Sequence, residues 1–320
     1  MASNIDRRAF MQQSLVSAAA GSAALAANPQ DAQAKAPPSQ KAQLPSGNIA
    51  GMSVSRILLG GNLLTHYTHS RDLKYVYTLA AHYNTEAKIL ETLALAEEHG
   101  INTLSIHTTE WTDPILRKYK RQGGKIQIII CPTAPADDSM EAYKKQVQYI
   151  ADMGFEALYL WGVRGDQLAA ANRPDLIKRA VEIVKEYNLP SGVGAHDLKV
   201  IRMCEETGVD ADFYIKTFHH HTYPTGPKPE QIKAPYSEFP GYWCSDPQAV
   251  IDVMKNVKKP WIAFKVMAAG AIPPENAFKY VFENGADHVL AGMFDFDIAP
   301  DVQIANNILK DLKRTRPWCS

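Results

Sequence analysis

The sequence predicts a single (β/α)₈ TIM barrel, an α/β fold, preceded by an export signal and a linker. Beyond residue 46, eight short apolar runs alternate with eight longer amphipathic segments, as strands and helices do in such a barrel. Four of these segments end at a glycine, which is typical of helix C-termini. No G-x-G-x-x-G follows the first apolar run, which disfavours the alternative, an open doubly wound sheet.

The predicted elements follow one another in strict order. The expected strands are the runs 56–62, 101–107, 125–131, 155–162, 190–196, 212–218, 260–266 and 287–293. The expected helices are 85–99, 113–122, 138–153, 174–187, 198–207, 246–257, 274–284 and 300–313. Several begin with a capping residue or a first-turn proline, such as Asp246-Pro247 or Pro274.

The first 34 residues differ in character from the rest of the chain. Arg7 and Arg8 precede an Ala- and Ser-rich stretch with small-residue cleavage options at 24–26 and 32–34. This resembles a twin-arginine export signal, which implies a periplasmic or otherwise exported protein and the export machinery as a partner. Residues 35–46 are expected to form a linker, and residues 47–320 the barrel domain.

The composition of the chain argues against nucleic acid and membrane-spanning roles. Lys and Arg number 34 and Asp and Glu number 34, so the formal net charge is zero and no basic surface for nucleic acid is predicted. No apolar run reaches the roughly 18–20 residues that span a bilayer. The four cysteines form no CxxC pair and predict no particular disulfide. The oligomeric state stays open.

Alternation along the strands predicts which side chains face the barrel interior. In the second run, Leu104 and Ile106 are expected toward the helices, which leaves His107 inside. In the fifth run, Val193 is expected toward the helices, which leaves His196 facing the barrel interior. Both histidines close their strands at the carboxyl end, where barrel enzymes have their active sites.

The sixth and seventh runs each carry a lysine. With Ile215 and Phe264 expected toward the helices, Lys216 and Lys265 point inward. A desolvated lysine can form a Schiff base with a carbonyl substrate, or it can stay charged and stabilise an enolate. The alternative is a structural ion pair with an acidic residue of the rim.

Three consecutive histidines follow the sixth run. Alternation directs His220 inward, or His219 if a bulge shifts the register. Together with His107 and His196 they are candidate ligands for a divalent transition metal whose identity stays open. Glu110, just past the second run, is a candidate fourth ligand or base. The alternative is that each imidazole is hydrogen-bonded within a polar pocket.

Two connections are long enough to form walls of a site. Residues 219–244 contain five prolines and several aromatic residues, and loops of this length in barrels are often lids. The alternative is a proline-stiffened surface loop. The insertion 63–84, with His66, Tyr67 and His69, is expected opposite. The predicted substrate-binding residues are Tyr236, Tyr242, Trp243 and, just past the eighth run, Asp295.

Three segments resemble those of aldo-keto reductases: "VSRILLGGN", "EAKILETLALAEEHGINTLSIHTTE" and "ALYLWGVRGD". The resemblance implies a barrel and NADPH-dependent carbonyl reduction by an Asp, Tyr, Lys and His tetrad. The aspartate position falls at Ser105 or His107, the tyrosine region contains "TTEWTD", and the lysine and histidine positions fall at Cys131 and Gly162. No tetrad residue is therefore carried over. The second half is similar to uncharacterised exported bacterial barrel proteins.

Together these features predict an exported, metal-assisted lyase or isomerase that acts on a carbonyl-bearing sugar or related small molecule. One alternative is an oxidoreductase that binds NAD(P) and has altered catalytic residues. The other is a non-catalytic carbohydrate-binding barrel.

Overall fold

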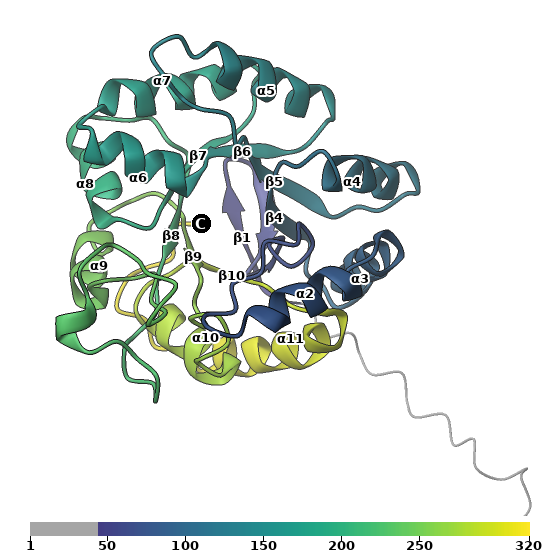
Figure 1. The fold of residues 1–320 in the computed structure, drawn as a ribbon, viewed down its shortest axis with the longest axis vertical. Coiled ribbons are helices and arrows are strands. Elements are labelled where there is room, and N and C mark those ends of the chain that lie inside the picture. The colour runs from purple at the N-terminus through teal and green to yellow at the C-terminus, as the bar shows by residue number, and fades with distance from the viewer. Residues whose placement is uncertain (1–43) are drawn as a thin grey trace, which may run out of the picture. The chain divides into compact units, whose positions relative to one another are not determined.

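The predicted barrel is confirmed. A computed structural model describes residues 44–320, and in it eight parallel strands close into a barrel in the order β10-β3-β4-β5-β6-β7-β8-β9, with helices outside (Figure 1). The predicted signal and most of the predicted linker lie outside the described residues. The barrel strands are β3 (Ile57–Gly60), β4 (Thr103–His107), β5 (Gln127–Cys131), β6 (Ala157–Leu160), β7 (Ser191–Ala195), β8 (Phe213–Thr217), β9 (Trp261–Phe264) and β10 (His288–Ala291).

Each expected helix is present, with small shifts of its ends. They are α3 (Glu86–Glu98), α4 (Thr112–Arg121), α5 (Glu141–Asp152), α7 (Pro174–Lys185), α8 (Leu198–Glu206), α9 (Pro247–Met254), α10 (Pro274–Glu283) and α11 (Asp295–Lys310). Helix α11 starts at Asp295 rather than at residue 300, because Pro300 is accommodated inside it. The sequence prediction missed α2 (Lys74–Tyr83), α6 (Gly162–Ala170) and a short 3₁₀ turn, η1 (Pro229–Gln231).

A hairpin that was not predicted seals one end of the barrel. Strands β1 (Ser46–Ile49) and β2 (Met52–Ser55) pair antiparallel. Ile49 and Val54 are buried in the apolar cluster inside the barrel. The Ser53 carbonyl accepts hydrogen bonds from Asn102 and Gln127, at the starts of β4 and β5. The hairpin therefore covers the amino-terminal end of the strands, and the carboxyl ends are left for a site.

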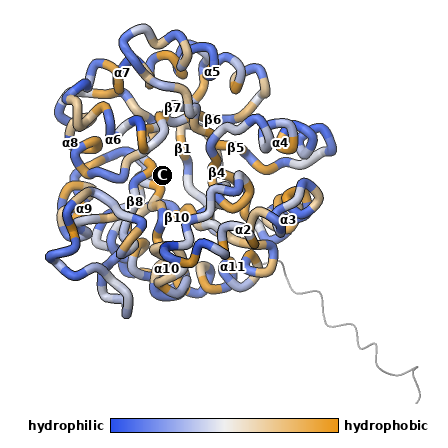
Figure 2. The backbone as a smooth tube through the Cα atoms, viewed as in Figure 1, coloured by the Kyte–Doolittle hydropathy of each residue, from blue (hydrophilic) through white to orange (hydrophobic). Residues whose placement is uncertain are grey.

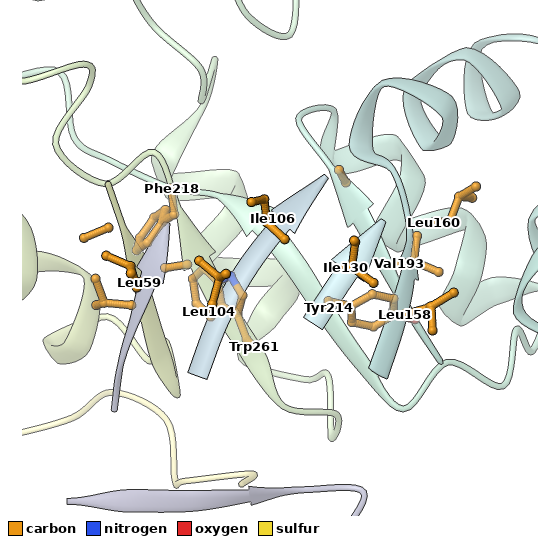
Figure 3. Packing of buried hydrophobic residues seen from close by; sticks show 14 of the residues in the cluster. Leu59, Leu104, Ile106, Ile130, Leu158, Leu160, Val193, Tyr214, Phe218 and Trp261 are labelled. Atoms are coloured by element: carbon orange, nitrogen blue, oxygen red, sulfur yellow. The ribbon is translucent and has the colours of Figure 1, made fainter. Parts of the chain in front are cut away.

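Apolar side chains fill both faces of the strand ring. The outer layer, between strands and helices, includes Leu104, Val193 and Trp261 (Figure 3). The inner layer includes Ile129 and Ile215. Hydrophobic and hydrophilic segments alternate along the surrounding helices (Figure 2), as expected where one face of each helix is buried. No helix in residues 44–320 is long and apolar enough to cross a membrane.

The predicted alternation is correct for β4 and β7 and wrong for β8 and β9. Leu104, Ile106 and Val193 belong to the outer layer as expected. Ile215 and Phe264 instead belong to the inner one. Both faces of these strands are apolar, so hydrophobicity alone does not decide which face turns inward.

The C-terminal segment returns to the amino-terminal end of the barrel. Asp287, just before β10, is fully buried and accepts hydrogen bonds from the Arg314 and Arg316 side chains. The Trp318 ring lies between two guanidinium groups, with Arg56 at 3.7 Å and Arg314 at 3.4 Å from its centroid. These contacts hold residues 314–319 against the amino-terminal end of the barrel.

Candidate active site

A cavity of about 960 Å³ opens at the carboxyl ends of the barrel strands. Its walls come from the loops after β3, β4 and β9, from the start of α6, from the end of β7, and from the long loop after β8. The side chains that line it and can carry or transfer protons include His69, His107, His196, Glu238 and Lys265. The predicted rim residue Glu110 lies at its edge, exposed to solvent.

Lys265 reaches this cavity through an unusual backbone conformation. Phe264, the last residue of β9, already faces inward, so simple alternation would turn Lys265 toward the helices. Lys265 has a φ of 55°, in the left-handed region, which redirects its side chain into the cavity next to Phe264. Burial lowers the pKa of the Lys265 ammonium to about 7, although the charges of Glu238 and Asp166 oppose this.

The amine of Lys265 is hydrogen-bonded to a histidine and not to a carboxylate. Its Nζ lies 2.7 Å from His69 Nε2, and His69 Nδ1 is bonded to Glu238. Because Glu238 is ionised, Nδ1 carries the imidazole proton and Nε2 accepts from Lys265. Burial alone would raise the pKa of Glu238, but the hydrogen bond and charge of His69 and the charge of Lys265 lower it overall. Burial lowers the pKa of His69.

A second histidine is held by a carboxylate. His196 Nδ1 lies 2.7 Å from Asp166 Oδ2, and Asp166 Oδ1 accepts from the backbone N–H of His196 at 3.0 Å. Asp166 comes from α6, which approaches β7 closely because Gly165 has no side chain: a Cβ there would lie 2.6 Å from the Gly194 oxygen. His196 Nε2 is left for the cavity, and burial lowers the pKa of this imidazole despite Asp166.

Aromatic rings and a third histidine complete the walls. The Tyr236 ring packs 4.5 Å from the His196 ring, and Tyr67 contacts His107 edge-on at 5.9 Å. His107 makes no hydrogen bond to any part of the chain that the structure describes. Burial lowers the pKa of His107 to about 4, with the charge of His69 adding to the effect, so this imidazole is neutral at pH 7.

The fold resembles solved aldo-keto reductases at low sequence identity. A protein of Pseudomonas aeruginosa named as a candidate aldo-keto reductase is 17% identical, with a TM-score of 0.56 over 83% of this chain and 94% of that one. An aldo-keto reductase from Bacillus halodurans is 11% identical, with a TM-score of 0.55 over 86% of this chain and 98% of that one. Similarity at this level establishes the barrel fold only.

The sequence comparisons identify no family. No family model matches the chain. No curated protein matches it either.

The histidine triplet holds the long loop and does not line the cavity. His219 Nδ1 bonds the His220 carbonyl at 2.8 Å, and its Nε2 accepts from the Trp243 N–H at 2.9 Å. His220 bonds Asn276 and the Thr222 N–H. His221 Nε2 donates to the Cys244 carbonyl. The expectation that His219 or His220 faces the site was wrong. The inner face of β8 is the one that carries Ile215, so alternation turns His220 away from the cavity. His219 lies past the end of β8, and its two ring nitrogens hold it within the loop.

Four other predicted site residues also lie outside the lining of this cavity. Lys216 is buried outside the cavity, and its Nζ bonds the Thr217 carbonyl at 2.8 Å. The Tyr242 hydroxyl bonds backbone atoms of its own loop. Asp295 pairs with Lys88 at 3.0 Å, away from the cavity. Trp243 is buried, with its ring 5.1 Å from Lys265 Nζ and 5.5 Å from the His69 ring. It supports the cavity wall from behind.

The predicted metal ligands are not brought together. His107 and His196 line the cavity, whereas both ring nitrogens of His219 are already used. Within residues 44–320, no three side chains among His, Cys, Asp and Glu are grouped so that they could hold a metal ion. The donor set in this part of the chain therefore does not fit a metal centre.

His219→Leu is expected to lower the free energy of unfolding by about 1–3 kcal/mol, because the buried Trp243 N–H loses its acceptor. Urea unfolding of the variant measures this loss. His82→Leu is the matched control, since His82 is exposed and bonds only within its own helix. A His219 variant as stable as wild type would contradict the structural role.

Proposed function

We propose that the protein is a lyase or isomerase that binds a small carbonyl compound as an imine on Lys265. One observation carries this proposal: a cavity-lining lysine whose amine is bonded to a neutral histidine and whose pKa is lowered to about 7. An uncharged amine is the nucleophile that attacks a carbonyl carbon. About half of the Lys265 side chains would be uncharged near pH 7.

The Lys265–His69–Glu238 chain suits the proton transfers of imine formation. Nucleophilic attack leaves a surplus proton on Nζ, and His69 Nε2, at 2.7 Å, is placed to accept it. Glu238, bonded to Nδ1, would stabilise the imidazolium that forms. The carbinolamine hydroxyl then takes up a proton from solvent and leaves as water, which breaks the carbon–oxygen bond and gives the iminium. The iminium draws electrons from the neighbouring carbon, which promotes either carbon–carbon cleavage or loss of a proton from that carbon.

The opposite wall supplies the second acid or base. His196 is oriented through Nδ1 by Asp166, which leaves Nε2 to exchange a proton with substrate. His107 is neutral and lacks a hydrogen-bond partner in the described chain, so it can bond a substrate oxygen. Tyr67 and Tyr236 present ring faces and hydroxyls, a combination that suits a sugar or another hydroxylated compound.

The nicotinamide alternative has less support from the cavity walls. A dinucleotide pyrophosphate needs cations or free amides at a helix N-terminus. A second cavity beside the first carries Asp297 and Asp301, from the first two turns of α11. The Asp297 carboxylate already accepts the backbone N–H of Phe294 there. These acidic residues do not fit a pyrophosphate in that cavity.

Reductive trapping tests the proposal. The protein is incubated with dihydroxyacetone, glyceraldehyde or pyruvate, reduced with borohydride, and analysed by intact mass and peptide mapping. A stable adduct is expected on Lys265, with none when borohydride is omitted. Adducts spread over the exposed lysines, or no adduct with any carbonyl compound, would contradict an imine-forming site.

The trapping rate is expected to rise with pH around a midpoint near 7, as Lys265 loses its proton. Glu238→Gln should move this midpoint to lower pH, because the Glu238 charge is one of the influences that raise the pKa of Lys265 against burial. Glu110→Gln, at the exposed edge of the cavity, is the matched control and should leave the midpoint unchanged. A midpoint that rises in Glu238→Gln would contradict the assigned contact.

A further inference from the structure

A second, smaller cavity of about 410 Å³ adjoins the first. The carboxyl ends of β3, β9 and β10 and the start of α11 surround it. His69, Phe264 and Lys265 line both cavities and form the wall between them. The proposed imine chemistry leaves this second cavity without a role.

Two carboxyl groups one helical turn apart line its α11 side. Asp301 is only 4% exposed and has no hydrogen-bond or ion-pair partner in the described chain. Asp297 accepts the backbone N–H of Phe294 at 3.0 Å through one oxygen, and its other oxygen has no such partner. A buried carboxyl group without a partner is costly for a folded protein. Burial and the charge of Asp297 raise the pKa of Asp301 to about 7.

A separate polar group of this cavity also lacks a partner. The Thr68 hydroxyl, from the loop between β3 and α2, is buried without a hydrogen bond, and the residue is 9% exposed. The remaining walls are largely apolar and include Val76, Ile272 and Phe294. The cavity therefore combines an apolar body with unused oxygen atoms from two different elements.

We propose that this second cavity binds a small organic ammonium compound with an apolar body. The ammonium group would donate hydrogen bonds to Asp301 and Asp297 and to the Thr68 oxygen, while the apolar part contacts Val76 and Ile272. A cation between two carboxylates removes their mutual repulsion, and charge-assisted hydrogen bonds of this kind are the stronger ones. Binding is non-covalent and does not depend on the imine chemistry.

Calorimetric titration with three probes of one shape tests the site: 2-phenylethylammonium, 2-phenylethanol and phenylacetate. The ammonium probe is expected to bind at least about tenfold more tightly than the alcohol, and phenylacetate more weakly still. Asp301→Asn should weaken ammonium binding by about tenfold or more. Equal affinity of the three probes, or unchanged ammonium binding in Asp301→Asn, would overturn the proposal.

Two further variants separate a local effect from a loss of folding. Asp295→Asn is the matched control, because Asp295 is on the same helix but pairs with Lys88 outside the cavity. It should bind the ammonium probe like wild type. Thr68→Val tests the site from another element and should also weaken binding of the ammonium probe. If Asp301→Asn fails to fold, Thr68→Val and Asp297→Asn decide the question. Wild-type affinity in both of these variants would then overturn the proposal.

Asp301→Asn also distinguishes this site from the imine site, because it should keep the borohydride adduct on Lys265 while it weakens ammonium binding. Loss of trapping alone would therefore count against the proposed function and not against the ammonium site.

Discussion

Lys265→Met is expected to abolish the borohydride-dependent adduct, and with it any turnover of the carbonyl substrate. Methionine fills a similar volume in the cavity wall but has no nucleophile, so imine formation has no starting atom. The effect should be a complete loss of labelling at this position, because no other lysine combines burial in this cavity with a histidine partner in residues 44–320. Intact mass before and after reduction measures it.

Three further variants make the result specific. Lys265→Arg keeps a cation but cannot form an imine, so it should also lose the adduct. His69→Gln should slow trapping by about 100-fold, the usual contribution of a positioned base. Lys216→Met is the matched control. Lys216 is only 1% exposed, but its amine bonds Thr217 outside the cavity, so this variant should leave trapping unchanged.

A different pattern would redirect the assignment. If Lys216→Met lost the adduct and Lys265→Met kept it, the nucleophile would lie on the outer face of β8. The arrangement described here would then be wrong. If both variants kept the adduct, labelling would come from surface lysines, and peptide mapping would identify them.

The barrel is clear from the sequence because the same unit, a short apolar strand followed by an amphipathic helix, repeats along the chain. Alternating strands and helices, glycine C-caps and helix-start residues all point to the same order, and α3, α4, α7 and α10 lie within a few residues of their expected places. The hairpin β1–β2 was missed because "SGNI" and "MSVS" are short and mixed in polarity. Such segments carry little periodic signal.

The site was less predictable for two physical reasons. A barrel has an apolar interior as well as an apolar outer layer, so Ile215 and Phe264 fit either side of their strands. The prediction placed Lys265 inside by assuming the wrong face for Phe264, and the left-handed backbone at Lys265 compensates for that error. Lys216 has no left-handed backbone of this kind, so the prediction that it points inward was wrong.

Partners of Lys265 come from loops, where sequence patterns say little about position. His69 lies in an insertion and Glu238 in a proline-rich connection, and 169 residues separate them in the chain. The sequence predicted that residues 63–84 and 219–244 form opposing walls of the site. It could not single out Glu238 within the second segment, because a carboxylate in a long loop is ordinarily solvated.

Asp287→Ala is expected to lower the free energy of unfolding by about 3–5 kcal/mol, the cost of removing one partner from a buried ion pair. Asp287 is fully buried, with Arg316 Nη1 at 2.7 Å and Arg314 Nη2 at 3.4 Å. It also accepts the backbone N–H groups of Trp261 and Cys319, both at 2.9 Å. Its removal leaves two buried guanidinium groups without a carboxylate.

Urea unfolding of the barrel domain, followed by far-UV circular dichroism, measures this loss. The matched control is Asp210→Asn, because Asp210 pairs with Lys185 at 2.7 Å but its side chain is 86% exposed. That pair should contribute no more than about 1 kcal/mol. Equal losses in the two variants would mean that the C-terminal segment is not fastened by Asp287. A large loss for Asp287→Ala alone, with Lys265 trapping retained under native conditions, would show that this end of the barrel supports folding and the opposite end the chemistry.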